Sequence, residues 1–449
     1  MRGRLSLLYF LQFAIWGCYL SCFGQLLGAG GLGADIQWFY AAVGIVSLVT
    51  PPLMGHFADR FIPSLRLLGC CHLCASVLMF GAWIYASSHP QLEFWAFFPI
   101  YVGFLAFYMP TMALSNTTTF ALLKKDGKQP VDHFPIIRVW GTLGFVAAMW
   151  FVNSAWYHDG MFGFTLSDLN PFARFRFQYT SMQLLVSAIL GLITALYTIT
   201  LPIAPVPAKG RGSSLSDIFG FKAFRLFKIP EVRTFLIFAI FTGVCLQISN
   251  GFATPYINHF MAFEEYLGSM AAGNATLLVS LSQISEAACI LIVGISMRRI
   301  GFKSVILLAL LSWCLRFLFL GFGNPGSGLW MLILSMFVYG IAFDFFNIAG
   351  HIYMDQMSDR ETRGFGQGLL MMMTNGIGAT GGMVVAGSVI NSFCKWEMID
   401  SPSGNGMMRL FMGDWLVPWL IFSGYALSVG ILFLIFFRQN KNEIKQNYI

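Results

Sequence analysis

The stretch YGIAFDFFNIAG, from Tyr339 to Gly350, places a carboxylate in the middle of an apolar run that begins with LWMLILSMFV at Leu329. The run is long enough to cross a bilayer as a helix, which takes about 20 residues. An ionised side chain at the centre of such a helix costs about 2.5–3.5 kcal/mol on insertion scales. Asp344 therefore needs a wet cavity, a partner side chain or a functional reason to stand there.

The composition of the whole chain is that of a membrane protein. Of its 449 residues, 57% are hydrophobic and 10% are charged, and the mean hydropathy is +0.69. Soluble proteins keep about a quarter of their residues charged. The apolar runs do not alternate with polar residues as the strands of a membrane β-barrel do. We therefore expect helices in a lipid bilayer, and we attribute the net charge of +7 to membrane topology and not to nucleic-acid binding.

Twelve membrane-spanning helices are predicted, which makes the fold class an all-α membrane protein. The first run is too long for a signal peptide and has no small-residue cleavage site after it, so it is interpreted as a span. The predicted spans are residues 5–28, 35–56, 66–87, 93–122, 134–155, 179–201, 232–260, 269–297, 302–322, 328–355, 363–391 and 414–437.

Lys and Arg residues outside these spans gather in the loops on one side. The opposite side carries only Arg174, Arg176, Lys395 and Arg409. Because cytoplasmic loops hold the excess of Lys and Arg, both termini are expected in the cytoplasm. Two arginines fall within spans. Arg316 lies near the outer end of its span and is interpreted as an interface anchor.

A long basic connection divides the chain into two halves. The predicted domains are a six-helix bundle over 1–201, a cytoplasmic linker with an amphipathic segment over 202–231, and a second six-helix bundle with a cytoplasmic tail over 232–449. A weak repeat links the halves, because GHFADR (55–60) and GISMRR (294–299) both follow or end the second span of a half. Related halves around a central site are typical of secondary transporters.

Segments spread over nearly the whole chain resemble the bacterial nucleoside:proton symporters of the major facilitator superfamily. They are FLQFAIWG (10–17), FPIIRVWGTLGF (134–145), LQISN (246–250), SLSQISE (280–286), YGIAFDFFNIAG (339–350) and LMMMTNGIG (370–378). In addition, GHFADR (55–60) resembles the loop motif of the superfamily. The resemblance implies a major facilitator fold with pseudo-symmetric halves of six helices each. It also implies proton-coupled nucleoside import by alternating access across a bacterial cytoplasmic (inner) membrane. The loops 156–178 and 392–413 depart from the family pattern.

Polar side chains recur one helical turn apart within two predicted spans of the second half. Gln247 and Asn250 form one such pair, and Gln283 and Glu286 form the other. Residues three apart lie on one face of a helix, so the four groups predict a hydrogen-bonding wall for a neutral polar ligand. The alternative is polar packing between helices, which Asn and Gln also provide.

Three residues of the first half share a face of the span 134–155, because Arg138, Thr142 and Phe145 follow one another at i, i+4 and i+7. On the sequence alone, snorkelling of Arg138 to the interface is as well supported as a role in a site. The resemblance implies that it lies beside the substrate. The substrate-binding residues that it implies are Arg138, Thr142, Phe145, Gln247, Asn250, Gln283, Glu286, Tyr339 and Phe343. It also implies that Asp344 couples the proton and that Asp59 and Arg60 form a conformational latch.

No arrangement of nucleophile and base and no phosphate-binding loop is found, so the chain is not expected to be an enzyme. We expect an ion gradient as the energy source, no cofactor, no metal site, and a monomer that takes a small-molecule substrate and a proton. Two alternatives remain open. One is a proton-coupled symporter for a sugar or another small polar solute, and the other is a channel or a membrane receptor that does not transport.

Overall fold

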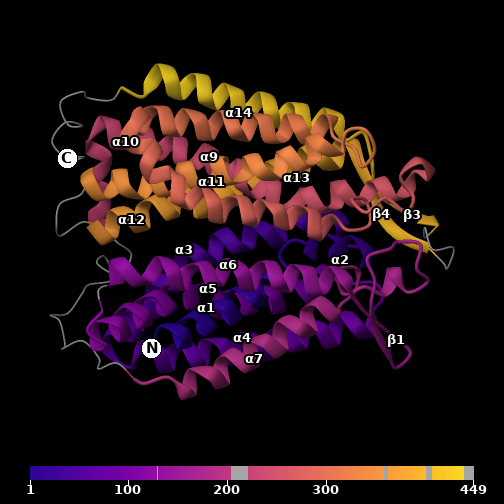
Figure 1. Cartoon of the computed structure of the whole chain (residues 1–449), viewed down its shortest axis with the longest axis horizontal. Helices are drawn as coiled ribbons and strands as arrows, with labels where there is room; N and C mark the ends of the chain where they lie inside the picture. The colour runs from indigo at the N-terminus through magenta and orange to yellow at the C-terminus, as the bar shows by residue number, and fades with distance from the viewer. Residues whose placement is uncertain (129, 204–220, 358–362, 401–406, 439–449) are drawn as a thin grey trace. The chain divides into compact units, whose positions relative to one another are not determined.

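The computed structural model describes residues 1–128, 130–203, 221–357, 363–400 and 407–438. Helices dominate it (Figure 1). Within these residues, ten helices are long and apolar enough to cross a membrane. The prediction of a helical membrane protein is therefore confirmed.

The chain packs into two contact units, and each is described by itself. Unit 1 comprises Met1–Ser213, Asn250–Ser280 and Cys394–Gly413, and unit 2 comprises Ser214–Ser249, Leu281–Phe393 and Asp414–Ile449. The division cuts through two helices, so it groups residues by contact and does not mark covalent domains. The domain boundaries predicted at residues 201 and 232 stay a prediction.

Unit 1 is built on seven helices of the N-terminal part of the chain. The first predicted span is not continuous, because its helix ends at Gly17 and a second short helix begins at Phe23 after a turn. The other predicted spans of this part appear with ends shifted by a few residues. The helices are α1 (Arg2–Gly17), α2 (Phe23–Ala29), α3 (Ile36–Arg60), α4 (Ser64–Ser88), α5 (Phe94–Lys125), α6 (Pro130–Ser154) and α7 (Met182–Thr200).

Glycines let α1 and α6 lie unusually close together. A Cβ atom at Gly17 would collide with the backbone of Phe145, and one at Gly144 would collide with the backbone of Phe10. Small residues at such crossings allow membrane helices to pack backbone against backbone. The contact fixes the rotation of α6, and with it the direction of the face that carries Arg138 and Thr142.

Two β-hairpins occupy the loops that depart from the family pattern, and neither was predicted. Strands β1 (Ala155–His158) and β2 (Met161–Phe164) pair antiparallel, as do β3 (Cys394–Asp400) and β4 (Met407–Gly413). In the second hairpin, the Trp396 ring takes the space that a Cβ atom at Gly28 or Gly33 would need. Glycines near the end of α2 thus make room for this hairpin.

The remaining helices run through the C-terminal part of the chain. They are α9 (Pro230–His259), α10 (Ala275–Phe322), α11 (Leu329–Met357), α12 (Arg363–Met371), α13 (Ala379–Phe393) and α14 (Leu416–Phe436). α10 covers two predicted spans, and its backbone breaks between them at Gly301, where φ is 79°. Glycine adopts this left-handed conformation without the steric penalty that a side chain brings. The helix begins at Ala275, whereas the span was predicted from residue 269.

The predicted span 363–391 is not a uniform α-helix. Between α12 and α13 lies a π-helical segment, η7 (Met372–Gly378). Here too the backbones approach closely, since a Cβ atom at Gly378 would collide with the backbone of Ile240 on α9. π-helical turns are rare and concentrate at functional sites.

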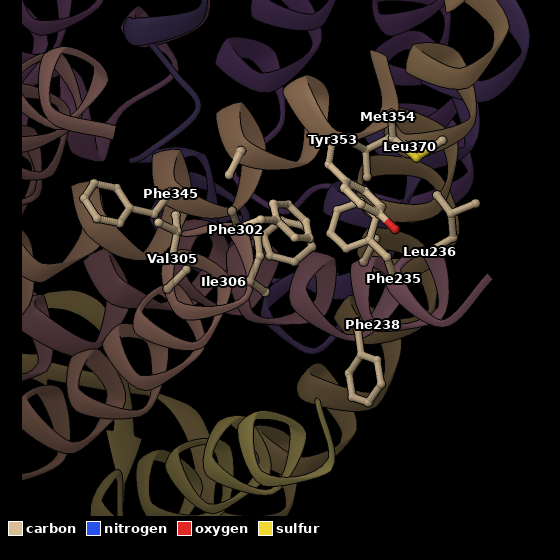
Figure 2. Packing of buried hydrophobic residues seen from close by; sticks show 14 of the residues in the cluster. Phe235, Leu236, Phe238, Phe302, Val305, Ile306, Phe345, Tyr353, Met354 and Leu370 are labelled. Carbon is tan, nitrogen blue, oxygen red and sulfur yellow. The ribbon is translucent and has the colours of Figure 1, made fainter. Parts of the chain in front are cut away.

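An aromatic cluster forms the core of unit 2 near the break at Gly301 (Figure 2). The Phe302 and Tyr353 rings stack with centroids 4.3 Å apart, and Phe235 meets Tyr353 edge-on at 5.2 Å. These three side chains come from α10, α9 and α11 and are all buried. Moving such a ring from water into a protein interior contributes about 1.5–3 kcal/mol to the free energy of folding. In unit 2 the rings also fix how the three helices pack.

Candidate functional site

Tyr339 on α11 is the residue around which unit 2 gathers most of the predicted site. Its buried ring stacks nearly parallel to Phe343, with centroids 5.7 Å apart and an angle of 11°. Gln283 lies within hydrogen-bonding reach of Tyr339, and both Glu286 and Asp344 lie within electrostatic range of it. Five residues predicted from two distant stretches of sequence are therefore neighbours.

The two acids of this group come from different helices. Asp344 on α11 is 3% exposed, and Glu286 on α10 is half-buried. Cys289, one turn after Glu286, lies within electrostatic range of both. The helices meet at Gly340, where a Cβ atom would collide with the backbone of Ser285. This glycine is what allows the two carboxyl groups to share one neighbourhood.

Arg316 does not lie at an interface, and its prediction as an interface anchor is wrong. The side chain is 1% exposed. Its Nε donates a hydrogen bond to Ser249 Oγ at 2.9 Å, and its Nη1 donates to the backbone carbonyl of Ser335 at 2.8 Å. The guanidinium also lies over the Tyr339 ring, with Cζ 4.5 Å from the centroid. The apolar run around Arg316 gives no sign of these partners, which come from α9 and α11.

A hollow with an empty volume of about 230 Å³, counting its solvent-open part, adjoins Phe343. Because this volume includes space open to solvent, the hollow is a shallow feature of unit 2 and not an enclosed binding site. The hollow is lined by residues of α9, α10, α11 and η7, namely Thr242, Gly243, Leu246, Trp313, Ala342, Phe343, Phe346, Asn347, Thr374 and Asn375.

Sequence reasoning missed Trp313 and Asn375 as members of this surface. Trp313 stands edge-on to Tyr339, with ring centroids 5.8 Å apart. Asn375 lies in the π-helical segment, whose shape the sequence does not indicate. A usable signal was present in each case. Trp313 precedes the intramembrane Arg316 by one turn, and Asn375 is a polar residue inside the apolar stretch LMMMTNGIG.

The remaining predicted residues lie on α6 and α9. In unit 1, Arg138 is half-buried with its Cζ 4.0 Å from the centre of the Phe13 ring, and Thr142 and Phe145 are buried on the same face of α6. On α9, Gln247 is buried and belongs to unit 2. Asn250, one turn later, is the first residue of the segment Asn250–Ser280, which groups with unit 1. The side chains of Asp59 and Arg60 lie outside the described part of the chain.

Unit 1 contains a second buried polar cluster, which was not predicted. Arg176 is fully buried in the connection before α7, and its Nη1 donates to Asn274 Oδ1 at 2.9 Å. Asn153 donates to the same oxygen at 2.7 Å, and the Arg176 Cζ lies 5.3 Å from the Tyr179 ring centre. Asp168 is buried nearby, within electrostatic range of Arg176. Burial raises the pKa of the Asp168 carboxyl above its ordinary value of 3.8, while Arg176 acts in the opposite direction.

Comparisons with known proteins cover nearly the whole chain. Residues 1–442 match a protein family described as nucleoside H⁺ symporter. Xanthosine permease of Escherichia coli strain K12 is 35% identical over 446 residues, which cover 98% of this chain and 97% of that protein. Nucleoside permease NupG of the same strain is 33% identical over 441 residues, with coverages of 98% and 96%.

Solved structures agree with the sequence relatives. The crystal structure of the nucleoside transporter NupG matches with a TM-score of 0.81 and 32% identity, over 98% of this chain and 99% of that one. A bacterial homologue of the human lysosomal transporter Spinster matches with a TM-score of 0.63 at 14% identity, over 97% and 94% of the two chains. At that identity the likeness shows the fold alone.

Proposed function

This chain belongs to the nucleoside H⁺ symporter family and imports nucleosides together with protons. On this premise, we propose roles for its residues. The match to the family over residues 1–442 is the observation that carries this function. A transporter of this kind is not an enzyme. Its fold is that of the major facilitator superfamily, as the match to NupG supports.

We further propose that the chain crosses the membrane twelve times, in two halves of six helices. Ten candidate spans are the starting point. α10 would cross twice, turning at Gly301, and the broken pair α1 and α2 would make one more crossing. The distribution of Lys and Arg supports cytoplasmic termini. We propose the bacterial inner membrane as the location, a monomer as the working form, and the proton gradient as the energy source without a cofactor.

The nucleoside would be held by an amide and carboxyl wall and by aromatic faces. Gln247, Gln283 and Glu286 offer hydrogen-bond donors and acceptors that suit ribose hydroxyl groups and base edges. The half-buried Phe343 ring, which lines the hollow, offers a flat face on which a planar base packs well, and the buried Tyr339 ring supports it by stacking. Thr142, Phe145, Arg138 and Asn250 would add contacts from their own faces of α6 and α9.

Asp344 would carry the proton. A carboxyl group buried among helices is tolerated far better when neutral than when ionised. Protonation would therefore favour closure of the site around the substrate, and loss of the proton would require contact with water. Coupling follows if the nucleoside binds the protonated carrier more tightly, because a ligand shifts an equilibrium only by its differential affinity. Asp59 and Arg60 are proposed to latch one conformation.

The test is a competition experiment with purified protein in liposomes. Uptake of radiolabelled uridine, driven by an inward proton gradient, would be measured against an excess of uridine, inosine, xanthosine, glucose or lactose. The nucleosides are expected to compete and the sugars are not. Equal competition by the sugars would favour the small-solute alternative, and uptake that never exceeds the outside concentration would favour a channel.

A further inference from the structure

Arg316 is the least expected side chain in unit 2, because it brings a permanent charge into the interior. The pKa of arginine is too high for deprotonation to relieve the cost of burial under ordinary conditions. Among the residues that the structure describes, no carboxylate forms an ion pair with it. Its hydrogen bonds go instead to hydroxyl and carbonyl oxygens and, at 3.9 Å, to the Met336 sulfur. A buried cation satisfied in this way remains a source of positive potential for its surroundings.

The partners of Arg316 come from each helix that carries the predicted unit 2 site. Ser249 on α9 accepts from Nε, Ser282 on α10 accepts from Nη1 at 3.3 Å, and the Ser335 carbonyl on α11 accepts from Nη1. Ser249 lies two residues after Gln247, and Ser282 directly precedes Gln283. The guanidinium thus ties together the backbone segments that present the amide wall.

Tyr339 is held from two directions. The guanidinium covers one part of its ring at 4.5 Å, and Phe343 stacks on it at 5.7 Å. A planar guanidinium over an aromatic face is a directional contact that an ammonium group reproduces poorly. Loss of the guanidinium would leave the ring free to rotate away from the position in which it supports Phe343.

Charged side chains of both signs lie around Tyr339. The groups within electrostatic range of its hydroxyl are Glu286 and Arg316 from α10 and Asp344 from α11. The α9 residue that bonds the guanidinium, Ser249, is uncharged. Arg316 therefore brings a positive charge close to the two acids. A proton on either acid lowers the negative charge that a closed interior would have to hold.

We infer that Arg316 is a positioning residue of the transport site, which orients the Tyr339 ring and supplies a fixed positive charge beside the two acids. This inference rests on the proposed function and adds to it a residue that holds the ring of Tyr339 and places a cation close to the two acids. Arg316 itself makes no contact with the nucleoside in this account.

The test uses two variants that separate orientation from charge. Arg316→Lys keeps the charge but not the planar face, so its KM for uridine should rise about two- to tenfold, the range of one lost ring contact, while the pH dependence of uptake stays as in the parent. Arg316→Gln loses both. Its KM should rise similarly. The pH above which uptake is lost, its alkaline pH limit, should also move up by about one pH unit or more, because the acids hold their protons more tightly without the neighbouring cation.

Arg176→Gln is the matched control, since Arg176 is also fully buried, hydrogen-bonded and placed over a tyrosine ring. It should lose thermal stability as Arg316→Gln does, without moving the pH limit. A parental pH limit in Arg316→Gln, or a parental KM in Arg316→Lys, would overturn the inference. Absence of uridine uptake by the parent protein would instead overturn the proposed function.

Misfolding of Arg316→Gln would also be informative. If the lost cation is the cause, adding Glu286→Gln removes a negative charge from the same group and should return a folded, monodisperse protein. A double variant that is as unstable as the single one would contradict the role of the Arg316 charge beside Glu286.

Discussion

Replacement of Asp344 by asparagine should uncouple transport from the proton gradient. The substitution keeps the shape of the side chain and removes its titratable group. Asp344 lies about 22 Å from one end of α11 and about 20 Å from the other, at 1.5 Å per residue along a helix of 29 residues. The side chain is 3% exposed, so from this depth it cannot reach an interface by snorkelling.

The size of the effect follows from the energy that the proton brings. A potential of 100 mV contributes about 2.3 kcal/mol for each charge carried inward, and one unit of pH difference contributes about 1.4 kcal/mol. One coupled proton therefore supports a concentration ratio of about 500. In proteoliposomes with both gradients imposed, the parent protein should approach this ratio for radiolabelled uridine. Asp344→Asn should stop at a ratio of about 1.

Counterflow distinguishes uncoupling from loss of the protein. Asp344→Asn should still exchange internal unlabelled uridine for external labelled uridine, because exchange needs no net proton movement. Glu286→Gln is the matched control, since it removes the other acid near Tyr339; it should bind uridine more weakly but still accumulate it. Uphill accumulation by Asp344→Asn equal to that of the parent would refute the assignment of the proton to this residue.

Three further substitutions test other parts of the account. Gln283→Ala should raise the KM for uridine about two- to tenfold, the range expected for one lost hydrogen bond, and an unchanged KM in uptake assays would remove this residue from the site. Gly340→Ala should lower the melting temperature in detergent, because its Cβ atom would meet the backbone of Ser285. Gly294→Ala is the control and should not lower it, because its Cβ atom would stand in open space. Equal melting temperatures of the two variants would contradict the close packing of α10 and α11. Asp168→Asn should raise the melting temperature at pH 7 and lose this advantage near pH 4. The pKa of Asp168 is raised by burial in the folded protein. The stability that the neutral carboxyl contributes is therefore fully present at a pH below its ordinary pKa, and it is lost as the pH rises through its pKa in the folded protein. If the variant exceeds the parent in melting temperature by the same amount at pH 4 and pH 7, this explanation is contradicted.

Much of the fold was open to prediction because each span must satisfy its backbone hydrogen bonds within itself. Length and hydropathy therefore located most helices to within a few residues. The exceptions have local causes that hydropathy does not record. The turn at residues 18–22 interrupts the first apolar run without a charged residue, glycine or proline, and the π-helical segment Met372–Gly378 lies within an apolar run that also suits an α-helix.

The candidate site shows where such reasoning ends. Glu286 and Asp344 stand out because an acid is costly in lipid, and the structure places both near Tyr339. Arg316 is equally costly, but arginine near the end of a span has an ordinary explanation in snorkelling. Only the positions of Ser249 on α9 and Ser335 on α11 reveal that it points inward. Contacts between helices far apart in sequence cannot be read from the spacing within one helix.

The most direct measurement is of the proton itself. Liposomes containing the parent protein and a trapped pH-sensitive dye, with equal pH on both sides and the potential clamped at zero, would receive external uridine. The lumen should acidify as uridine enters, at one proton for each nucleoside, and Asp344→Asn should admit uridine without acidification. Entry of uridine into the parent liposomes at constant internal pH would contradict this prediction.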